Sequence, residues 1–212
     1  MKSLLLVGGG GHCHACIDVI EAEGKYKITG IIEQTGGNSE SVLGYQILGN
    51  ENELSKLVKK CSTALITVGQ IKNADLRVRL FQQLQGLGFE LPTIISPRAY
   101  VSKNATLGAG TIVMHDALIN SGAKIGNNCI LNTKSLVEHD AIVEDHCHIS
   151  TSSVVNGGTI IREKTFIGSN TITKEYITVG KTSVIGGGLI VVSDVQENTL
   201  MKNNEHIIAE KG

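Results

Sequence analysis

The chain has no tryptophan, three phenylalanines, four tyrosines and only two prolines among its 212 residues. With so few rings, its core must be built from aliphatic and small side chains, and hydrophobic residues make up 41% of the sequence. The net charge is −1, from 19 basic and 20 acidic residues, so neither a nucleic acid nor an anionic membrane is expected as a partner. No apolar run reaches the length of a membrane-spanning helix.

Cysteine is scarce too, and its five residues do not suit a disulfide framework. An odd number of cysteines, with no secretory signal after Met1, predicts reduced thiols and a cytoplasmic protein. Cys129 and Cys147 are 18 residues apart and are expected to be buried packing residues. The stretch from His12 to Cys16 offers half of a zinc site, but structural zinc needs a second pair of ligands, so we predict no metal.

What the sequence has in abundance is a repeat of six residues between Val101 and Gln196. Every sixth residue from Val101 is Leu, Ile or Val in fifteen of sixteen cases, although only 29 of the 96 residues in this stretch are. A period of six fits neither an amphipathic helix nor an alternating strand. It is typical of a parallel β-helix rather than a β-sandwich, because three short strands make one coil of about 18 residues and neighbouring coils bury each other.

The first 95 residues have a different pattern, in which apolar strands alternate with amphipathic helices. Strands are expected at 3–7, 28–32 and 64–68, and helices at 12–23, 51–60 and 75–87. This alternation predicts a small α/β, Rossmann-like doubly wound domain at residues 1–95, followed by the β-helix domain at residues 96–212.

A glycine turn, Gly8 to Gly11, separates the first predicted strand from the first predicted helix. Gly8, Gly10 and an acidic residue near position 33 resemble part of a dinucleotide-binding fingerprint, but Cys13 replaces its third glycine. NAD is therefore the weaker alternative for this turn. Its backbone N–H groups at a helix start suit a phosphate or a sugar hydroxyl equally well.

The repeats and the glycine turn together resemble the left-handed β-helix acyltransferases, and within them the PglD- and NeuD-like sugar acetyltransferases. The segment from Ile130 to Asp140, ILNTKSLVEHD, is similar to the family's Ile-Leu-Asn-Thr-x-x-x-x-Glu-His segment, whose histidine is the general base. The resemblance implies that His139 is the catalytic base and that Asp140, where PglD-like members have Glu, orients its ring. It also implies a left-handed β-helix and a homotrimer with active sites between subunits.

The same resemblance implies two binding sites. The expected nucleotide-sugar site consists of Gly10, Gly11, His12, Glu33, Gln34, Gly69 and Asn132. The expected acetyl-CoA site consists of His148, Gly157, Ser169 and Gly187. Backbone N–H groups or His148 would stabilise the thioester oxyanion. Gly157 follows His139 by 18 residues, so it is expected on the neighbouring coil, where the missing side chain leaves room for a ligand.

These residues imply an enzyme that transfers an acetyl group from acetyl-CoA to a UDP-linked 4-amino sugar, in the synthesis of bacterial glycan precursors. One alternative is O-acetylation of a sialic-acid-like sugar, because residues 149–157 look more like NeuD than PglD. Another is a non-catalytic sugar-nucleotide sensor. The family's usual Gly-x-Pro-Ala ending is absent from residues 200–206, so no contact between the tail and CoA is predicted.

Overall fold

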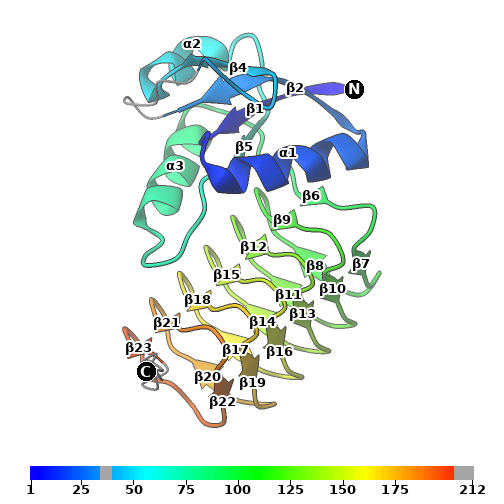
Figure 1. Cartoon of the computed structure of the whole chain (residues 1–212), viewed down its shortest axis with the longest axis vertical. Coiled ribbons are helices and arrows are strands. Elements are labelled where there is room, and N and C mark those ends of the chain that lie inside the picture. Colours follow the sequence, from blue (N-terminus) through cyan, green and yellow to red (C-terminus); the bar gives the residue numbers. More distant parts are fainter. Residues whose placement is uncertain (34–39, 203–212) are drawn as a thin grey trace, which may run out of the picture.

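A computed structural model describes residues 1–33 and 40–202, which form two domains stacked along the long axis of the molecule (Figure 1). The N-terminal domain holds a five-stranded sheet in the order β3-β4-β2-β1-β5. Its strands are β1 (Lys2–Val7), β2 (Tyr26–Ile32), β3 (Ser41–Val42), β4 (Tyr45–Gly49) and β5 (Ala64–Ile66). Its helices are α1 (Gly11–Glu23), the 3-10 helix η1 (Glu51–Glu53), α2 (Leu54–Leu57) and α3 (Asp75–Gly86).

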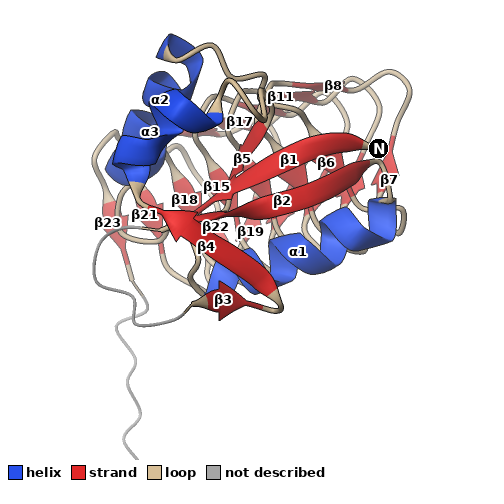
Figure 2. Ribbon diagram, turned by 90° about the horizontal axis from the view of Figure 1, so that it is seen from above, coloured by secondary structure: helices blue, strands red, loops and turns tan. Residues whose placement is uncertain are grey.

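The central strand β1 shows why this domain is doubly wound. Its side chains alternate between two faces: Leu4 and Leu6 pack with α1, while Leu5 and Val7 pack with residues of α2 and α3. Figure 2 shows α1 on one side of the sheet and α2 with α3 on the other. The α/β interpretation of the first segment is confirmed.

Two details of this domain differ from the sequence-based expectation. The helix predicted at 51–60 is wrong in its extent, because helical backbone covers only η1 and α2 and Leu54 is the only residue of either that is fully buried. The antiparallel pair β3–β4 was not predicted; its turn uses Leu43 and Gly44, both with positive φ. Neither segment carries a strong apolar pattern, so tertiary contacts decide its conformation.

The β-helix consists of two-residue strands arranged on three faces. Face 1 contains β6 (Ile94–Ile95), β9 (Ile112–Val113), β12 (Ile130–Leu131), β15 (His148–Ile149), β18 (Phe166–Ile167), β21 (Val184–Ile185) and β23 (Leu200–Met201). Face 2 contains β7 (Tyr100–Val101), β10 (Leu118–Ile119), β13 (Leu136–Val137), β16 (Val154–Val155), β19 (Ile172–Thr173) and β22 (Ile190–Val191). Face 3 contains β8 (Thr106–Leu107), β11 (Lys124–Ile125), β14 (Ile142–Val143), β17 (Ile160–Ile161) and β20 (Thr178–Val179).

The register of these strands confirms the period of six. Each strand pairs in parallel with the strand 18 residues further along, as Leu118 does with Leu136. The second residue of each strand points inward, so that Val113, Leu131 and Val137 belong to one buried column. The final coil is shorter, because Leu200 pairs with Val184, which is 16 residues before it. The protein is a left-handed parallel β-helix behind an α/β domain.

The outward residues of face 1 explain how the domains join. Ile94, Ile112 and Ile130 point away from the β-helix and are buried against Cys13 and Ile17 of α1. The first strand of the β-helix, β6, therefore lies within the last two residues of the segment assigned to the N-terminal domain. No helix within residues 1–33 and 40–202 is long and apolar enough to cross a membrane.

Candidate active site

His139 and Asp140 lie after β13, at the corner between face 2 and face 3. His139 Nδ1 lies 3.0 Å from Oδ2 of Asp140. A carboxylate accepts hydrogen bonds, so this contact places the ring proton on Nδ1 and leaves Nε2 with a free lone pair. The side chain of His139 is 53% exposed, so Nε2 is available to a ligand. This is the geometry of an oriented imidazole base.

Gly157 occupies the same corner one coil further along. A Cβ atom at this position would lie 2.6 Å from His139 Nε2. The expectation that the glycine leaves room for a ligand is therefore corrected: the room is occupied by the ring of His139 itself. Gly157 allows the base to lie flat across the neighbouring coil.

A second group of predicted residues lies where face 1 meets the N-terminal domain. His148 Nδ1 is 2.6 Å from the backbone oxygen of Gln70, and its Nε2 is 3.2 Å from Nδ2 of Asn132. The rings of His12 and His148 are 6.4 Å apart between centroids. Gly69 lies directly against His12, because a Cβ atom there would be 3.5 Å from His12 Cβ. The fold thus brings together four residues that are up to 136 positions apart in the sequence.

Burial keeps both histidines of this group neutral. Desolvation, with a smaller effect of the nearby Arg77 charge, lowers the pKa of His12 to about 3. Burial likewise lowers the pKa of His148 to about 4. His148 points outward from its strand, as expected for a histidine of the repeat, but the N-terminal domain covers it.

Two buried polar atoms in this junction have no partner among the described residues: His12 Nε2 and Gln70 Oε1. Buried polar atoms are nearly always hydrogen-bonded, so such a pair is uncommon. Together they offer an acceptor and an imidazole nitrogen to a polar ligand entering between the domains.

The glycine turn forms the other edge of this junction. Gly10 caps α1, and both Gly10 and Gly11 are exposed with open space around them. The carboxyl group of Glu33 lies over the turn, since a Cβ atom on Gly9 would be 3.0 Å from its carboxyl carbon. A phosphate could approach the helix start here, while the acidic group faces another part of the ligand. Gln34, the other predicted residue, lies outside the described residues.

Ser169 and Gly187 lie along the edge between face 1 and face 2, on the side of the chain that carries Asn132. Ser169 Oγ is 3.0 Å from Oγ of Ser150. A Cβ atom on Gly187 would lie 3.0 Å from the backbone oxygen of Ser169. Both positions are exposed, so this edge presents hydroxyl groups and open backbone.

The predicted residues therefore fall into two groups within one chain. His139, Asp140 and Gly157 lie at the corner between faces 2 and 3, after β13 and β16. Asn132, Ser169 and Gly187 lie at the corner between faces 1 and 2, after β12, β18 and β21, near His148. The width of face 2 separates the groups, so one copy of the chain does not bring the base to the junction.

Sequence reasoning missed two residues that hold the junction together. Arg77 is 1% exposed, and its guanidinium donates to the backbone oxygens of Ile66 and Val68 and to Oδ1 of Asn128. A signal was present, because Arg77 shares a helical face with the apolar Leu80 and Leu84 of α3. Gln70 carried no signal, since it acts partly through its backbone.

A serine, a histidine and an aspartate also line up elsewhere. Ser96 Oγ lies 2.6 Å from His115 Nδ1, and His115 Nε2 lies 2.7 Å from Asp18 Oδ2. Ser96 is only 1% exposed, so its hydroxyl cannot meet a substrate. The row ties α1 to the first coil and is structural.

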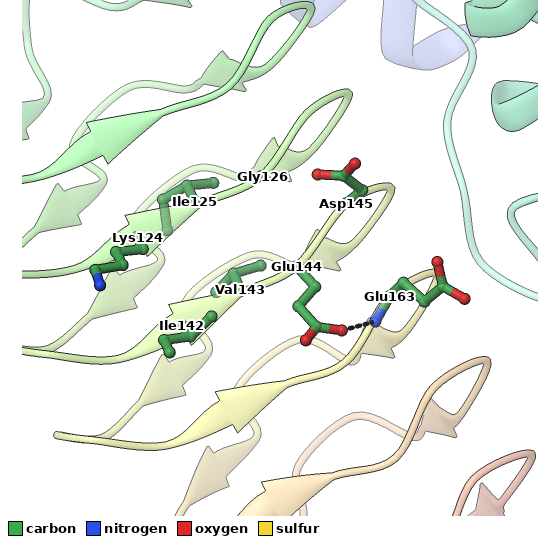
Figure 3. A pocket seen from close by; sticks show the side chains of 8 residues that line it. All are labelled: Lys124, Ile125, Gly126, Ile142, Val143, Glu144, Asp145 and Glu163. Atoms are coloured by element: carbon green, nitrogen blue, oxygen red, sulfur yellow. Dashed lines mark hydrogen bonds between the residues drawn. The ribbon is translucent and has the colours of Figure 1, made fainter.

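Face 3 carries a shallow groove that contains none of the predicted residues (Figure 3). Glu144 accepts hydrogen bonds from Arg162 and from the backbone N–H of Glu163, so it is satisfied within the protein. With Asp145 also in its wall, the groove is acidic and does not suit a polyanion such as CoA. Among the described residues, no group of three His, Cys, Asp or Glu side chains could hold a metal ion, and Cys13 and Cys16 are buried in the domain core.

Comparison with known proteins fits this architecture. Residues 3–84 match the PglD N-terminal domain. A curated relative, UDP-N-acetylbacillosamine N-acetyltransferase of Bacillus subtilis (strain 168), is 28% identical over 115 residues, which cover 54% of this chain and 52% of the relative. The match thus spans about half the length of that relative.

Solved structures match over nearly the whole chain. A mutant of perosamine N-acetyltransferase from Caulobacter crescentus, with CoA and GDP-perosamine, is 29% identical, with a TM-score of 0.88 over 93% of this chain and 92% of that one. The acetyltransferase domain of PglB from Neisseria gonorrhoeae, with acetyl coenzyme A, is also 29% identical, with a TM-score of 0.85 over 92% and 93% of the two chains.

The fold and the corner histidine define a β-helix protein of the hexapeptide-repeat class. Within that class, the chain belongs to the sugar N-acetyltransferase family in which a PglD-type N-terminal domain precedes the β-helix.

Proposed function

We propose that the protein transfers the acetyl group of acetyl-CoA to the amino group of a nucleotide-linked sugar. The observation that carries this proposal is the His139–Asp140 pair, because its free Nε2 can take a proton from an attacking amine. The relatives support the substrate class: one is named for a UDP-linked amino sugar, and another is bound to CoA and GDP-perosamine. We favour a UDP-linked 4-amino sugar.

The reaction needs a single base. The sugar amine attacks the thioester carbonyl carbon, and His139 Nε2 takes the proton that the nitrogen loses as the C–N bond forms. The tetrahedral intermediate then collapses, the C–S bond breaks, and the imidazolium returns its proton to the CoA thiolate. Asp140 stabilises the transient positive charge on the ring. The products are an N-acetyl sugar and free CoA thiol.

We further propose that the protein is a homotrimer whose subunits pack through face 2. The outward side chains of this face form an apolar row from Tyr100 to Ile190, with Leu118 and Ile172 between them, and these four are 36–72% exposed in a single chain. Apolar rows of this kind mark interfaces. A neighbour packed on face 2 could bring its own His139 towards the junction that holds His12 and His148.

In this arrangement the nucleotide part of the sugar substrate would lie by Gly10, Gly11, Glu33 and Gln34, while His12, Gly69 and Asn132 would line its sugar end. Acetyl-CoA would run along the edge that presents His148, Ser169 and Gly187. The five free thiols, all buried, support work in the reducing cytoplasm, where acetyl-CoA is available.

The test is release of CoA thiol from acetyl-CoA by the purified protein with a panel of UDP- and GDP-linked 4-amino sugars and free sialic acids. Release with one amino sugar, lost in His139→Ala, is the expected outcome. Release only with a sialic acid would replace the proposal by O-acetylation. No release with any acceptor, from protein that is folded and trimeric, would favour a sugar-nucleotide sensor.

A further inference from the structure

Gln70 joins the N-terminal domain to the β-helix at two points. It lies in the loop after β5 and is 2% exposed. Its backbone oxygen is 2.6 Å from His148 Nδ1, and its side-chain Nε2 donates to the backbone oxygen of His146 at 3.0 Å. The side chain thus anchors the loop on one coil residue, and the backbone contacts the residue two positions further.

The contact with His148 determines which ring nitrogen carries the proton. A backbone oxygen can only accept a hydrogen bond, so Nδ1 of His148 must be protonated. In a neutral imidazole the other nitrogen, Nε2, is then an acceptor. Burial favours the neutral form of this ring by lowering its pKa to about 4.

Asn132 is oriented by two neighbours in a consistent way. Its Oδ1 accepts from the backbone N–H of Thr133 at 2.8 Å, and its Nδ2 lies 3.2 Å from Nε2 of His148. A backbone N–H can only donate and this Nε2 can only accept, so both ends of the amide are assigned by its partners. One of the two N–H bonds of Asn132 is not used by these contacts.

We propose that Gln70 is a positioning residue: it sets the tautomer of His148, which in turn orients Asn132 so that its second N–H donates to the acetyl carbonyl oxygen. This inference rests on the proposed acetyl transfer. As the sugar amine adds to the carbonyl carbon, the C=O electron pair moves to oxygen, and the Asn132 N–H stabilises that charge until the C–S bond breaks. His148, with its proton directed at Gln70, is not the oxyanion donor.

The first measurement is nitrogen NMR of the full-length protein labelled in its histidines, without substrate. The His148 signal is identified by its loss in His148→Gln. We expect the wild type to carry the proton on Nδ1, and Gln70→Ala and Gln70→Glu to move His148 towards the Nε2-protonated form. Gln70→Glu keeps the size of the side chain but removes the donor to His146. Gln82→Ala, on the exposed side of α3, is the matched control.

The second measurement is steady-state kinetics with the accepted sugar. Both Gln70 variants should lower kcat by about 10-fold with little change in KM for the nucleotide sugar, and Asn132→Ala and Asn132→Asp by about 100-fold, the usual effect of removing one oxyanion donor. A merely structural role of Gln70 would lower thermal stability without a shift of the tautomer. Gln82→Ala should change neither quantity.

Two results would overturn the inference: a wild-type His148 protonated on Nε2, or Gln70 variants with an unchanged tautomer and unchanged kcat. The spectrum needs no substrate, so it separates this inference from the proposed function. If no acceptor supports turnover, the donor role of Asn132 fails with the proposed function, and the spectrum still decides whether Gln70 sets the tautomer.

Discussion

Nε2 of His139 lies 2.6 Å from the point where Gly157 would carry a Cβ atom. The glycine is therefore a seat for the base. Gly157→Ala should lower kcat by about 10-fold or more, because the ring is the movable partner and must leave its place. Its backbone has an ordinary φ, so the protein should keep its thermal stability within a few degrees. Gly86→Ala, at the open end of α3, is the control and should leave kcat unchanged.

Asp140→Asn should separate the orienting carboxylate from the base. Asp140 has a φ of 58°, a conformation that asparagine adopts easily, so the backbone should be undisturbed. Without the charge that stabilises the imidazolium, kcat should fall by about 10-fold, against about 100-fold or more for His139→Ala. The pH dependence of kcat, measured with acetyl-CoA saturating, is the readout. Equal activity of Asp140→Asn and wild type across pH 6–9 would remove Asp140 from the mechanism.

The buried histidines should make the fold sensitive to acid. His12 and His148 have lowered pKa values, about 3 and 4, so the folded chain does not bind their protons near pH 5 while the unfolded chain does, with an ordinary pKa of about 6.5. Stability should therefore fall as the pH drops below about 6.5, by up to about 1.4 kcal/mol per pH unit for each histidine.

Denaturant unfolding between pH 5 and 7.5 tests this expectation. His148→Gln should show a shallower loss of stability towards acid than the wild type, and the exposed His14→Gln should follow the wild type. Identical slopes for all three proteins would contradict the assignment of a buried neutral His148.

Arg77 should contribute far more to stability than the other arginine of the same helix. Arg77→Met leaves the backbone oxygens of Ile66 and Val68 and the Asn128 amide without their donor, which should cost about 2–4 kcal/mol. Arg79→Met removes an arginine whose side chain is 50% exposed and ion-paired at the surface, and should cost less than about 1 kcal/mol. Urea unfolding measures both; comparable losses would show that the buried network adds little.

The β-helix could be predicted almost completely, because an aliphatic residue at every sixth position suits a three-faced coil and conflicts with the periods of ordinary helices and strands. The residues four positions after each leader, such as Ala117, Ala123 and Cys129, also proved to be core. What the pattern could not give is the backbone of the corners. Non-glycine residues with positive φ recur there at intervals of six or multiples of six, including Lys134, Asp140, His146, Lys164, Asn170 and Tyr176. Residue types as different as lysine and tyrosine share this conformation, because the coil geometry imposes it.

The site was predictable only in its parts. His139, His12 and Asn132 were identified on short motifs, and their roles remain predictions. Their division into two groups on different corners follows from which face each preceding strand joins, and no single motif contains that information. Gln70 and Arg77 act through contacts with residues 51 to 78 positions away, which become visible only when the domains are assembled.

The pairing of every strand with the strand 18 residues further gives the molecule a unit of growth. Duplication or loss of one complete coil beyond Gly187 would change the length of the protein by one strand spacing, about 4.8 Å, and leave the contacts above it in register. An insertion of six residues would instead turn everything beyond it by one face. Variation in the length of such chains should therefore occur in whole coils, and only on the side away from the N-terminal domain.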